Sequence, residues 1–206
     1  MKEIKTYIID MKTLKQHIFE KLTVATPIYT LFPKSKEELE EIIESEIDKN
    51  GNECSLNHIN VSKITDMADL FFGSKFNGDI SDWDVSNVTN MDSMFYNSKF
   101  NGDISNWDVS NVENMSMMFA YSKFTGDISS WDVSNVETME GRFSDSIFNG
   151  DISKWDVSKV ENMDGMFYFA DFDGDISDWN VSNVTDMENM FKYSPLENNL
   201  PVWYKE

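Results

Sequence analysis

The residues of this chain that could do chemistry are carboxylates that recur at fixed spacing. One column of aspartates follows a recurrent glycine and comprises Asp79, Asp103, Asp127, Asp151 and Asp175. A second column follows a recurrent tryptophan and comprises Asp84, Asp108, Asp132 and Asp156, with Asn180 ending the series. Stacked carboxylates could bind a cation or a basic partner. Alternatively, each carboxylate closes its own turn by accepting backbone N–H groups, for which Asp-Val-Ser-Asn is a favourable sequence.

Other chemistry finds little support in the sequence. The aspartate spacing matches neither the EF-hand loop nor the glycine-rich nonapeptide that binds calcium. Methionines that recur beside phenylalanine are expected to fill the core rather than to bind a soft metal. His17 and His58 are isolated, Cys54 has no evident activating partner, and no nucleophile–base pair or phosphate loop is found. We therefore expect no catalytic residue, no cofactor and no metal, and the chain does not read as an enzyme.

The net charge restricts the class of partner. The chain carries a formal net charge of −20, and residues 56–206 hold 26 of its 37 acidic residues but only 9 of its 17 basic ones. An acidic surface argues against direct binding to nucleic acid or to an anionic membrane, because both require a basic surface. The expected partner is a protein, and a basic one by charge.

A strict period organises most of the chain. The six tryptophans are spaced by 24 residues without insertion or deletion: Trp83, Trp107, Trp131, Trp155, Trp179 and Trp203. Such periodicity indicates stacked coils. A degenerate first copy has Ile59 in the tryptophan column and Met67 in the methionine column. The sequence thus predicts one structural domain, with an N-terminal segment at residues 1–55 and a six-coil repeat solenoid at residues 56–203.

The apolar columns predict the elements of each coil. Trp83 and Val85 flank Asp84 with period two, which predicts a short parallel strand with the aspartate facing outward. A single helical or 3₁₀ turn is predicted next, from the recurrence of Val88, Met91, Met94 and Phe95. Asn101-Gly102-Asp103 predicts a tight turn for which glycine supplies backbone freedom.

Both ends of a stack of coils need caps. Ser35 and Glu38 form a capping box that opens an amphipathic helix, with Leu39, Ile42, Ile43 and Ile47 on one face and a stop near Gly51. At the other end the last copy decays, and Pro201 removes a backbone donor, which blunts the edge. Leu14, Ile18 and Leu22 indicate a further short helix near the N-terminus.

These columns, including GDISNWDVSNVENMSMMF, resemble the repeats of the BspA-like leucine-rich-repeat family of bacterial surface proteins, a unit also found in mycoplasma lipoproteins. The resemblance covers roughly residues 30–203. It implies a right-handed, leucine-rich-repeat-like solenoid that is displayed on the cell or secreted and acts in adhesion or protein–protein contact. As written, the chain shows no signal peptide and no apolar stretch of about 18 residues, so the sequence alone predicts a cytoplasmic protein.

The columns in which the copies disagree are the candidates for specificity. An aromatic group follows each Met-Phe pair and comprises Phe72, Tyr96, Tyr121, Tyr168, Phe169 and Tyr193. These rings either form an exposed contact stripe or lie flat over the coil and extend the core. The residue before each tryptophan also varies, Lys154 among them. Arg142, the only arginine, stands in a methionine column, and we expect its head to reach the surface over an apolar stem.

The sequence therefore predicts a non-enzymatic protein-binding scaffold, adhesin-like or a partner-interaction module. The alternative is an acidic DNA mimic that occupies a nucleic-acid-binding protein, because the negative charge is concentrated on the repeats. An enzyme acting on sugars is the third and weakest hypothesis, because an aspartate pair repeated in every coil is not how an active site is built.

Overall fold

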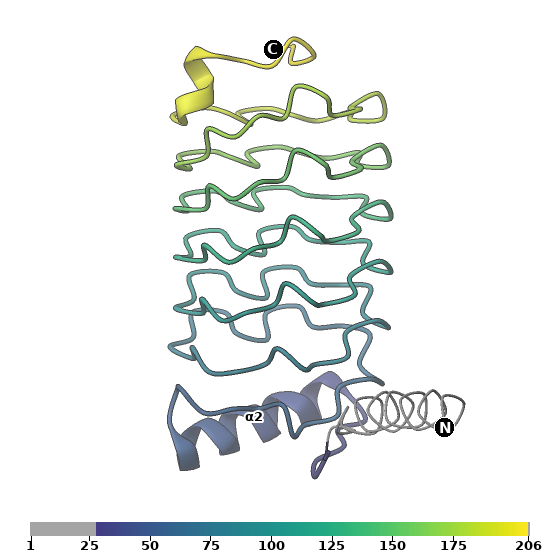
Figure 1. The fold of residues 1–206 in the computed structure, drawn as a ribbon, viewed down its shortest axis with the longest axis vertical. Coiled ribbons are helices and arrows are strands. Elements are labelled where there is room, and N and C mark those ends of the chain that lie inside the picture. The colour runs from purple at the N-terminus through teal and green to yellow at the C-terminus, as the bar shows by residue number, and fades with distance from the viewer. Residues whose placement is uncertain (1–27, 206) are drawn as a thin grey trace, which may run out of the picture.

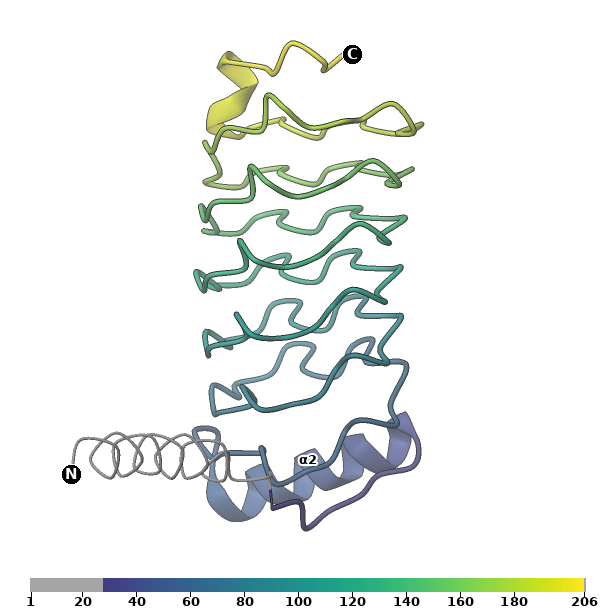
Figure 2. The same cartoon turned by 45° about the vertical axis from the view of Figure 1, so that its right-hand side comes forward.

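A computed structural model of the chain describes residues 28–205, and the helix predicted around Leu14, Ile18 and Leu22 lies outside these residues. The described chain winds into a stack of flat coils, with one α-helix lying across the N-terminal end of the stack (Figure 1). The view turned by 45° shows the same regular spacing from coil to coil (Figure 2). The named elements are α2 (Lys36–Asn50) and the 3₁₀ helix η1 (Pro195–Asn198).

Helix α2 begins and ends where its capping residues predict. The Ser35 hydroxyl accepts a hydrogen bond from the Glu38 N–H at 3.3 Å, and the Glu38 carboxylate accepts one from the Lys34 N–H at 2.9 Å. Gly51 ends the helix with φ at 84°, a left-handed conformation that favours glycine. Leu39 and Ile43 are buried against the first coil. The helix therefore covers the apolar columns that the first coil would otherwise expose to water.

The coils are in register at the 24-residue period. Isolated parallel bridges join residues 24 apart: Asp66 with Asn90, Asn90 with Asn114, Asn114 with Thr138, Thr138 with Asn162, and Asn162 with Asp186. Each tryptophan strengthens this register, because its indole N–H donates to a carbonyl 27 residues earlier, as from Trp107 to the Ile80 oxygen at 3.2 Å. Hydrogen bonds between coils thus replace extended strand ladders.

The strand predicted at Trp83–Val85 is wrong, because no bridge forms there. Turns closed by side chains flank these residues. The Asp79 carboxylate accepts from the Ser81 N–H at 3.0 Å, and the Asp84 carboxylate accepts from the Ser86 N–H at 3.2 Å. These turns bend the chain on both sides of Trp83, so the alternation of apolar and polar residues reflects a bent segment rather than a strand.

The helical turn predicted over Val88–Phe95 is also wrong, and consecutive tight turns take its place. Met94 N–H donates to the Met91 oxygen at 3.3 Å, and Tyr96 N–H donates to the Ser93 oxygen at 3.0 Å. Ser93 and Asn97 have φ of 54° and 49°, the sign that the third residue of a type II turn requires. Met91, Ser93 and Phe95 send their N–H groups to the next coil instead of to a helical acceptor. This exchange of hydrogen-bond partners explains why no helix forms.

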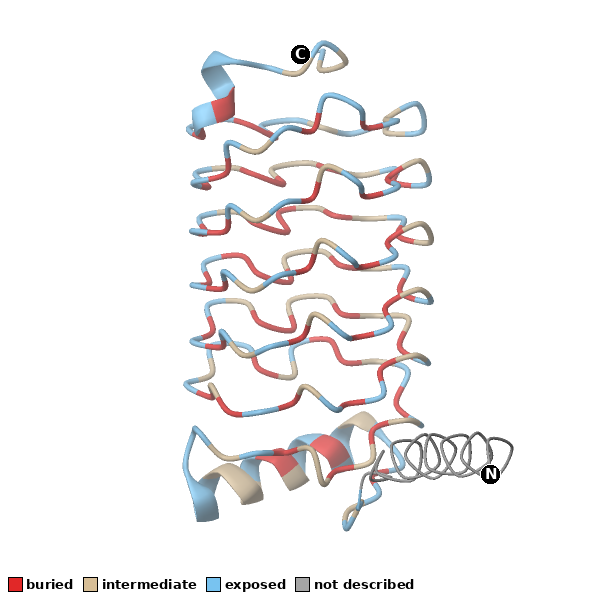
Figure 3. Ribbon diagram, in the orientation of Figure 1, coloured by how far each residue is buried: buried red, intermediate tan, exposed pale blue. Residues whose placement is uncertain are grey.

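Buried residues recur in every coil along the stack (Figure 3), and their side chains form one apolar core. Successive phenylalanines stack, with the ring centroids of Phe95 and Phe119 5.6 Å apart, and the rings of Trp83 and Trp107 lie 6.4 Å apart. The glycine column serves close approach rather than backbone freedom, since a Cβ on Gly102 would lie 2.8 Å from the Phe100 ring. Aromatic stacking therefore accounts for both the phenylalanine column and the glycine column.

Arg142 contradicts its prediction, because its side chain is fully buried in the methionine column. One guanidinium nitrogen, Nη1, lies 2.7 Å from the Met115 sulfur, while Nε and Nη2 have no hydrogen-bond partner. The guanidinium carbon sits 4.5 Å from the ring centroid of Trp155 and 5.7 Å from that of Trp131. Flanking aromatic faces hold the cation in place, so the head does not reach the surface. Burial lowers the pKa of Arg142 to about 9.

Candidate functional site

The aspartate columns close turns in every coil where they occur. Behind the glycine column, the carboxylates of Asp103, Asp127 and Asp151 accept from a serine N–H two residues on, at 2.9 to 3.0 Å. Behind the tryptophan column, Asp108 and Asp156 do the same at 3.1 and 3.0 Å. Asn180 closes the corresponding turn at 3.2 Å, which explains why an amide can replace the acid there. Both columns therefore have a structural role.

The same hydrogen bonds keep the columns charged. The Ser105 and Ser129 N–H groups lower the pKa of Asp103 and Asp127, with further help from the serine hydroxyls. The Ser110 hydroxyl and N–H likewise lower the pKa of Asp108. The lowered pKa values favour the charged form of Asp103, Asp108 and Asp127, which lie on the exposed side of the coils. Within residues 28–205, no group of three His, Cys, Asp or Glu side chains is arranged to hold a metal ion.

The aromatic residues that follow each Met-Phe pair, hereafter the aromatic flank, form two clusters. In the first, the ring of Tyr96 lies 4.7 Å from Phe72 and 5.3 Å from Tyr121. In the second, the ring of Phe169 lies 4.8 Å from Tyr168 and 4.3 Å from Tyr193. Ring contacts between successive coils hold each cluster together.

The residues of the aromatic flank are partly exposed and partly packed against one another, so each of the two predicted arrangements, an exposed stripe and an extension of the core, holds in part. About half of each of four residues is open to solvent: Phe72 at 54%, Tyr121 at 47%, Phe169 at 47% and Tyr193 at 53%. Tyr96 and Tyr168 are half-buried. The rings therefore lean on one another and still present apolar surface to a partner.

Between the two clusters lies a depression of about 480 Å³. The coil between Tyr121 and Phe169 contributes no aromatic ring here, because Asp145 stands at the position that Tyr121 and Phe169 occupy in its neighbours. Tyr96, Tyr121 and Tyr168 line the depression together with the small residues Ala120, Gly141, Ser144 and Gly165. The sequence signal for this hollow is the aromatic residue that is missing from this one coil.

The depression also contains carboxylates. Glu140 lines it and accepts from the Asn162 amide at 3.1 Å. Asp164 lines it as well, and its Oδ1 is buried without a hydrogen-bond partner. Burial and the nearby Asp186 raise the pKa of Asp164. An underpartnered carboxylate beside three tyrosines is a suitable environment for a cationic group.

The remaining predicted site residues lie away from this hollow. Lys154 is exposed and its charge contributes to lowering the pKa of Asp151, but it does not line the depression. The column of Asp84, Asp108, Asp132 and Asp156 does not line the depression either. The structure therefore does not unite the aromatic and acidic candidates into one site, and it adds Glu140 and Asp164 as acidic residues that the sequence did not single out.

No helix within residues 28–205 is long and apolar enough to cross a membrane. Comparison with protein families finds one match, described as a Mycoplasma protein of unknown function, DUF285, which covers residues 39–147 and again residues 120–203. No curated protein and no solved structure matches the chain.

Proposed function

The chain belongs to the Mycoplasma DUF285 family of unknown function, and from this premise we propose that it is a non-enzymatic protein-binding scaffold. The observation that carries the proposal is the depression between the two halves of the aromatic flank. Exposed tyrosines in successive coils are typical of protein-contact surfaces, because tyrosine contributes strongly to interface energetics. In this proposal the coil stack holds the rings at fixed spacing, and the partner supplies the complementary segment.

The chemistry of the depression favours a basic partner segment. A lysine or arginine side chain entering it would lie against the faces of Tyr96, Tyr121 and Tyr168 and close to Glu140 and Asp164. The aromatic flank already contacts a cation of this chain, since the Lys192 ammonium lies 5.5 Å from the Tyr193 ring. The net charge of −20 adds long-range attraction for such a segment.

The test is binding of synthetic peptides that carry lysine or arginine between apolar residues, compared with the same peptides carrying glutamate. We expect the basic peptides to bind, and the Tyr121→Ser variant to weaken binding by about tenfold or more. Ile147→Ser is the matched control, because Ile147 is 46% exposed and lies outside the aromatic flank. Equal weakening by both variants, or equal binding of the glutamate peptides, would remove the depression as the binding site.

We further propose that the stack is a right-handed, leucine-rich-repeat-like solenoid of the BspA-like kind, as the sequence resemblance implies. The 24-residue register of the bridges and the stacked phenylalanine column support this assignment. Small-angle scattering offers a direct test of the elongated shape. A compact scattering profile would contradict the assignment.

The acidic DNA mimic is a second candidate, and the exposed aspartate columns on the repeats, together with the net charge of −20, favour it. In this proposal a basic, nucleic-acid-binding protein would bind the chain in competition with duplex DNA. The variant that tests it replaces Asp108, Asp132 and Asp156 by asparagine, which Asn180 shows to be compatible with the turn. The mimic is favoured over the aromatic flank if the triple variant no longer competes with duplex DNA while the Tyr121→Ser variant competes as well as the wild type.

A further inference from the structure

The hydrogen bonds between coils have a direction. In the turn segment of each inner coil, alternate N–H groups donate to carbonyls of the following coil. Met163 donates to the Asp186 oxygen at 2.8 Å, Gly165 to the Glu188 oxygen at 2.8 Å, and Phe167 to the Met190 oxygen at 2.9 Å. Two bonds run the other way, since the Glu161 oxygen accepts from the Thr185 N–H at 2.8 Å and from the Asp186 N–H at 3.3 Å. Each coil therefore offers the next one an acceptor followed by a row of donors.

The last coil keeps this row without the partner. Within residues 28–205, the N–H groups of Met187, Asn189 and Phe191 have no acceptor, and the Thr185 oxygen has no donor. The fourth donor of the row is satisfied, because the Tyr193 N–H donates to the Glu197 carboxylate at 3.0 Å. We call this set of groups, on residues 185–191, the terminal edge.

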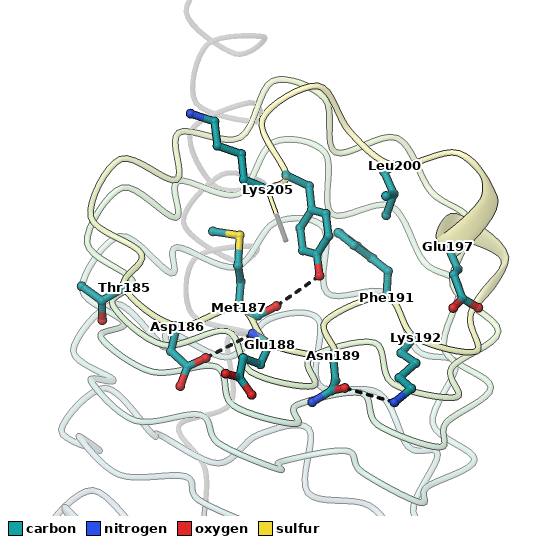
Figure 4. A pocket seen from close by; sticks show the side chains of 11 residues that line it. Thr185, Asp186, Met187, Glu188, Asn189, Phe191, Lys192, Glu197, Leu200 and Lys205 are labelled. Carbon is teal, nitrogen blue, oxygen red and sulfur yellow. Dashed lines mark hydrogen bonds between the residues drawn. The ribbon is translucent and has the colours of Figure 1, made fainter.

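There is space beside the terminal edge. A pocket of about 700 Å³ is lined by Thr185, Met187, Asn189 and Phe191 on one side and by Leu200, Tyr204 and Lys205 on the other (Figure 4). The Tyr204 hydroxyl donates to the Met187 oxygen at 3.4 Å, and its ring lies 5.0 Å from that of Phe191. Val184 and Met187 are partly open to solvent there, whereas Val160 and Met163 one coil earlier are fully buried. Pockets of this volume hold small ligands or short peptide segments.

We propose that the terminal edge binds a segment of a partner protein that runs parallel to it and adopts the same consecutive turns as an inner coil. The segment would donate one N–H to the Thr185 oxygen and offer alternate carbonyls to the N–H groups of Met187, Asn189 and Phe191. This is the pairing that each inner coil receives from its neighbour, and, as in β-strand addition, backbone hydrogen bonds provide most of the affinity. The surface is separate from the aromatic flank.

The charge around the terminal edge selects among segments. Asp186, Glu188 and Glu197 line the pocket with only Lys192 and Lys205 to balance them. The Lys192 ammonium is already within 3.5 Å of the Asn189 amide oxygen. A neutral or basic segment therefore fits, and an acidic one is repelled.

A second copy of the chain does not offer this segment. Two terminal edges facing each other would place donors opposite donors. The opposite end of the stack carries the matching carbonyls, but α2 lies across it and buries Leu39 and Ile43 against the first coil (Figures 1 and 2). The partner is therefore a different chain.

The probe is a synthetic, end-blocked peptide with the sequence of residues 89–98, in which lysine replaces Asp92. In the protein this segment supplies the carbonyls of Asn90, Asp92 and Met94 to the preceding coil, so it carries the required pattern. Amide exchange is measured by NMR on the full chain, with and without the peptide. At a peptide concentration of about ten times Kd, we expect exchange at Met187, Asn189 and Phe191 to slow by about tenfold.

The controls separate this proposal from the proposed function. Amides of Met163, Gly165 and Phe167 should be slow with or without peptide, and the all-D peptide, which has the same side chains but the wrong hand, should protect nothing. Tyr121→Ser should leave the protection unchanged even if it abolishes binding at the aromatic flank. The proposal is overturned if the three amides are already slow in the free protein, if the peptide protects none of them, or if they become protected through dimers that form as concentration rises.

Discussion

The two ends of the stack are closed in different ways. At the N-terminal end, α2 buries Leu39 and Ile43 completely or nearly so, at 0% and 4% exposure. At the C-terminal end, η1 and the residues after it cover less, and Leu200 is 42% and Val202 is 95% exposed. A helix satisfies its own backbone groups, so it can seal an apolar end without pairing with the coil edge. The C-terminal segment neither covers the apolar end completely nor pairs with all the backbone groups of the last coil.

The difference between the ends follows from the direction of the stack. At the N-terminal edge of the turn segments, the carbonyls of Ala68 and Leu70 accept no hydrogen bond within residues 28–205, while at the C-terminal edge the free groups of Met187, Asn189 and Phe191 are donors. Because the N–H groups of the turn segments donate to the following coil, the two ends of the stack expose different backbone groups. Within residues 28–205, α2 covers one end of the stack, while three backbone donors at the other end are unpaired.

The largest expected effect compares matched leucines at the two ends. Leu39→Ala removes a fully buried side chain between α2 and the first coil. We expect it to lower the free energy of unfolding by about 2–5 kcal/mol. Leu200→Ala, at a side chain 42% exposed, should cost less than about 0.5 kcal/mol. Urea denaturation measures both, and equal losses would show that the C-terminal segment caps the stack as firmly as α2 does.

Arg142 tests whether the two ends are coupled through the middle of the stack. Arg142→Met restores the residue that Met118 and Met166 provide in neighbouring coils and removes a buried, incompletely hydrogen-bonded cation. We expect it to stabilise the protein by about 1–4 kcal/mol at neutral pH. Hydrogen exchange should slow in the coils on both sides of residue 142 if neighbouring coils stabilise one another.

The gain from Arg142→Met should depend on pH. The pKa of Arg142 in the folded protein, about 9, is below its unfolded value, so below this pH both states are charged and the folded state bears the cost of burying the charge. As pH rises through 9, the folded state binds fewer protons than the unfolded state, and wild-type stability increases relative to the variant. Denaturation of both proteins at neutral pH and above about pH 10 measures the change. A constant difference would mean that the guanidinium stays charged.

The caps of the two ends predict a smaller difference. Ser35→Ala removes the N-cap of α2 and should cost about 1 kcal/mol. Glu197→Ala removes the acceptor for the Tyr193 N–H, an exposed contact, and should cost about 0.5 kcal/mol or less. Thermal unfolding of the two variants ranks them, and the reverse order would place the more important cap at the C-terminal end.

The smallest expected effect is the loss of stability at low pH from a single aspartate, and it concerns the inner coils rather than either end. Serine N–H groups lower the pKa of Asp127 below its ordinary value of 3.8. The stability from this turn is therefore complete at neutral pH and is lost as pH falls below 3.8 toward the folded pKa. Asp127→Asn keeps the acceptor and cannot titrate, so between about pH 5 and pH 3 its stability should fall less than that of the wild type. Parallel acid denaturation curves would contradict this role.

Much of the fold was predictable because the same pattern of residues recurs in every coil. The tryptophan spacing predicted the register that the bridges have, and Ser35 with Glu38 predicted the start of α2. The local conformations were less predictable. Apolar residues three and four positions apart fit a helix and consecutive turns equally well, and only Gly141 and Gly165, in the column where Ser93 has a positive φ, pointed to turns.

For the candidate sites, too, the sequence determined positions while the tertiary structure decided contacts. The sequence by itself determined the positions of the aromatic flank and the acidic columns, because residue type and period are enough to place a side chain on a coil. Only the tertiary structure decided that the aspartates close turns, that Arg142 is buried between aromatic rings, and that a hollow separates two aromatic clusters. The terminal edge also became visible only there, because an unpaired donor is defined by the neighbour that each inner coil has and the last coil lacks.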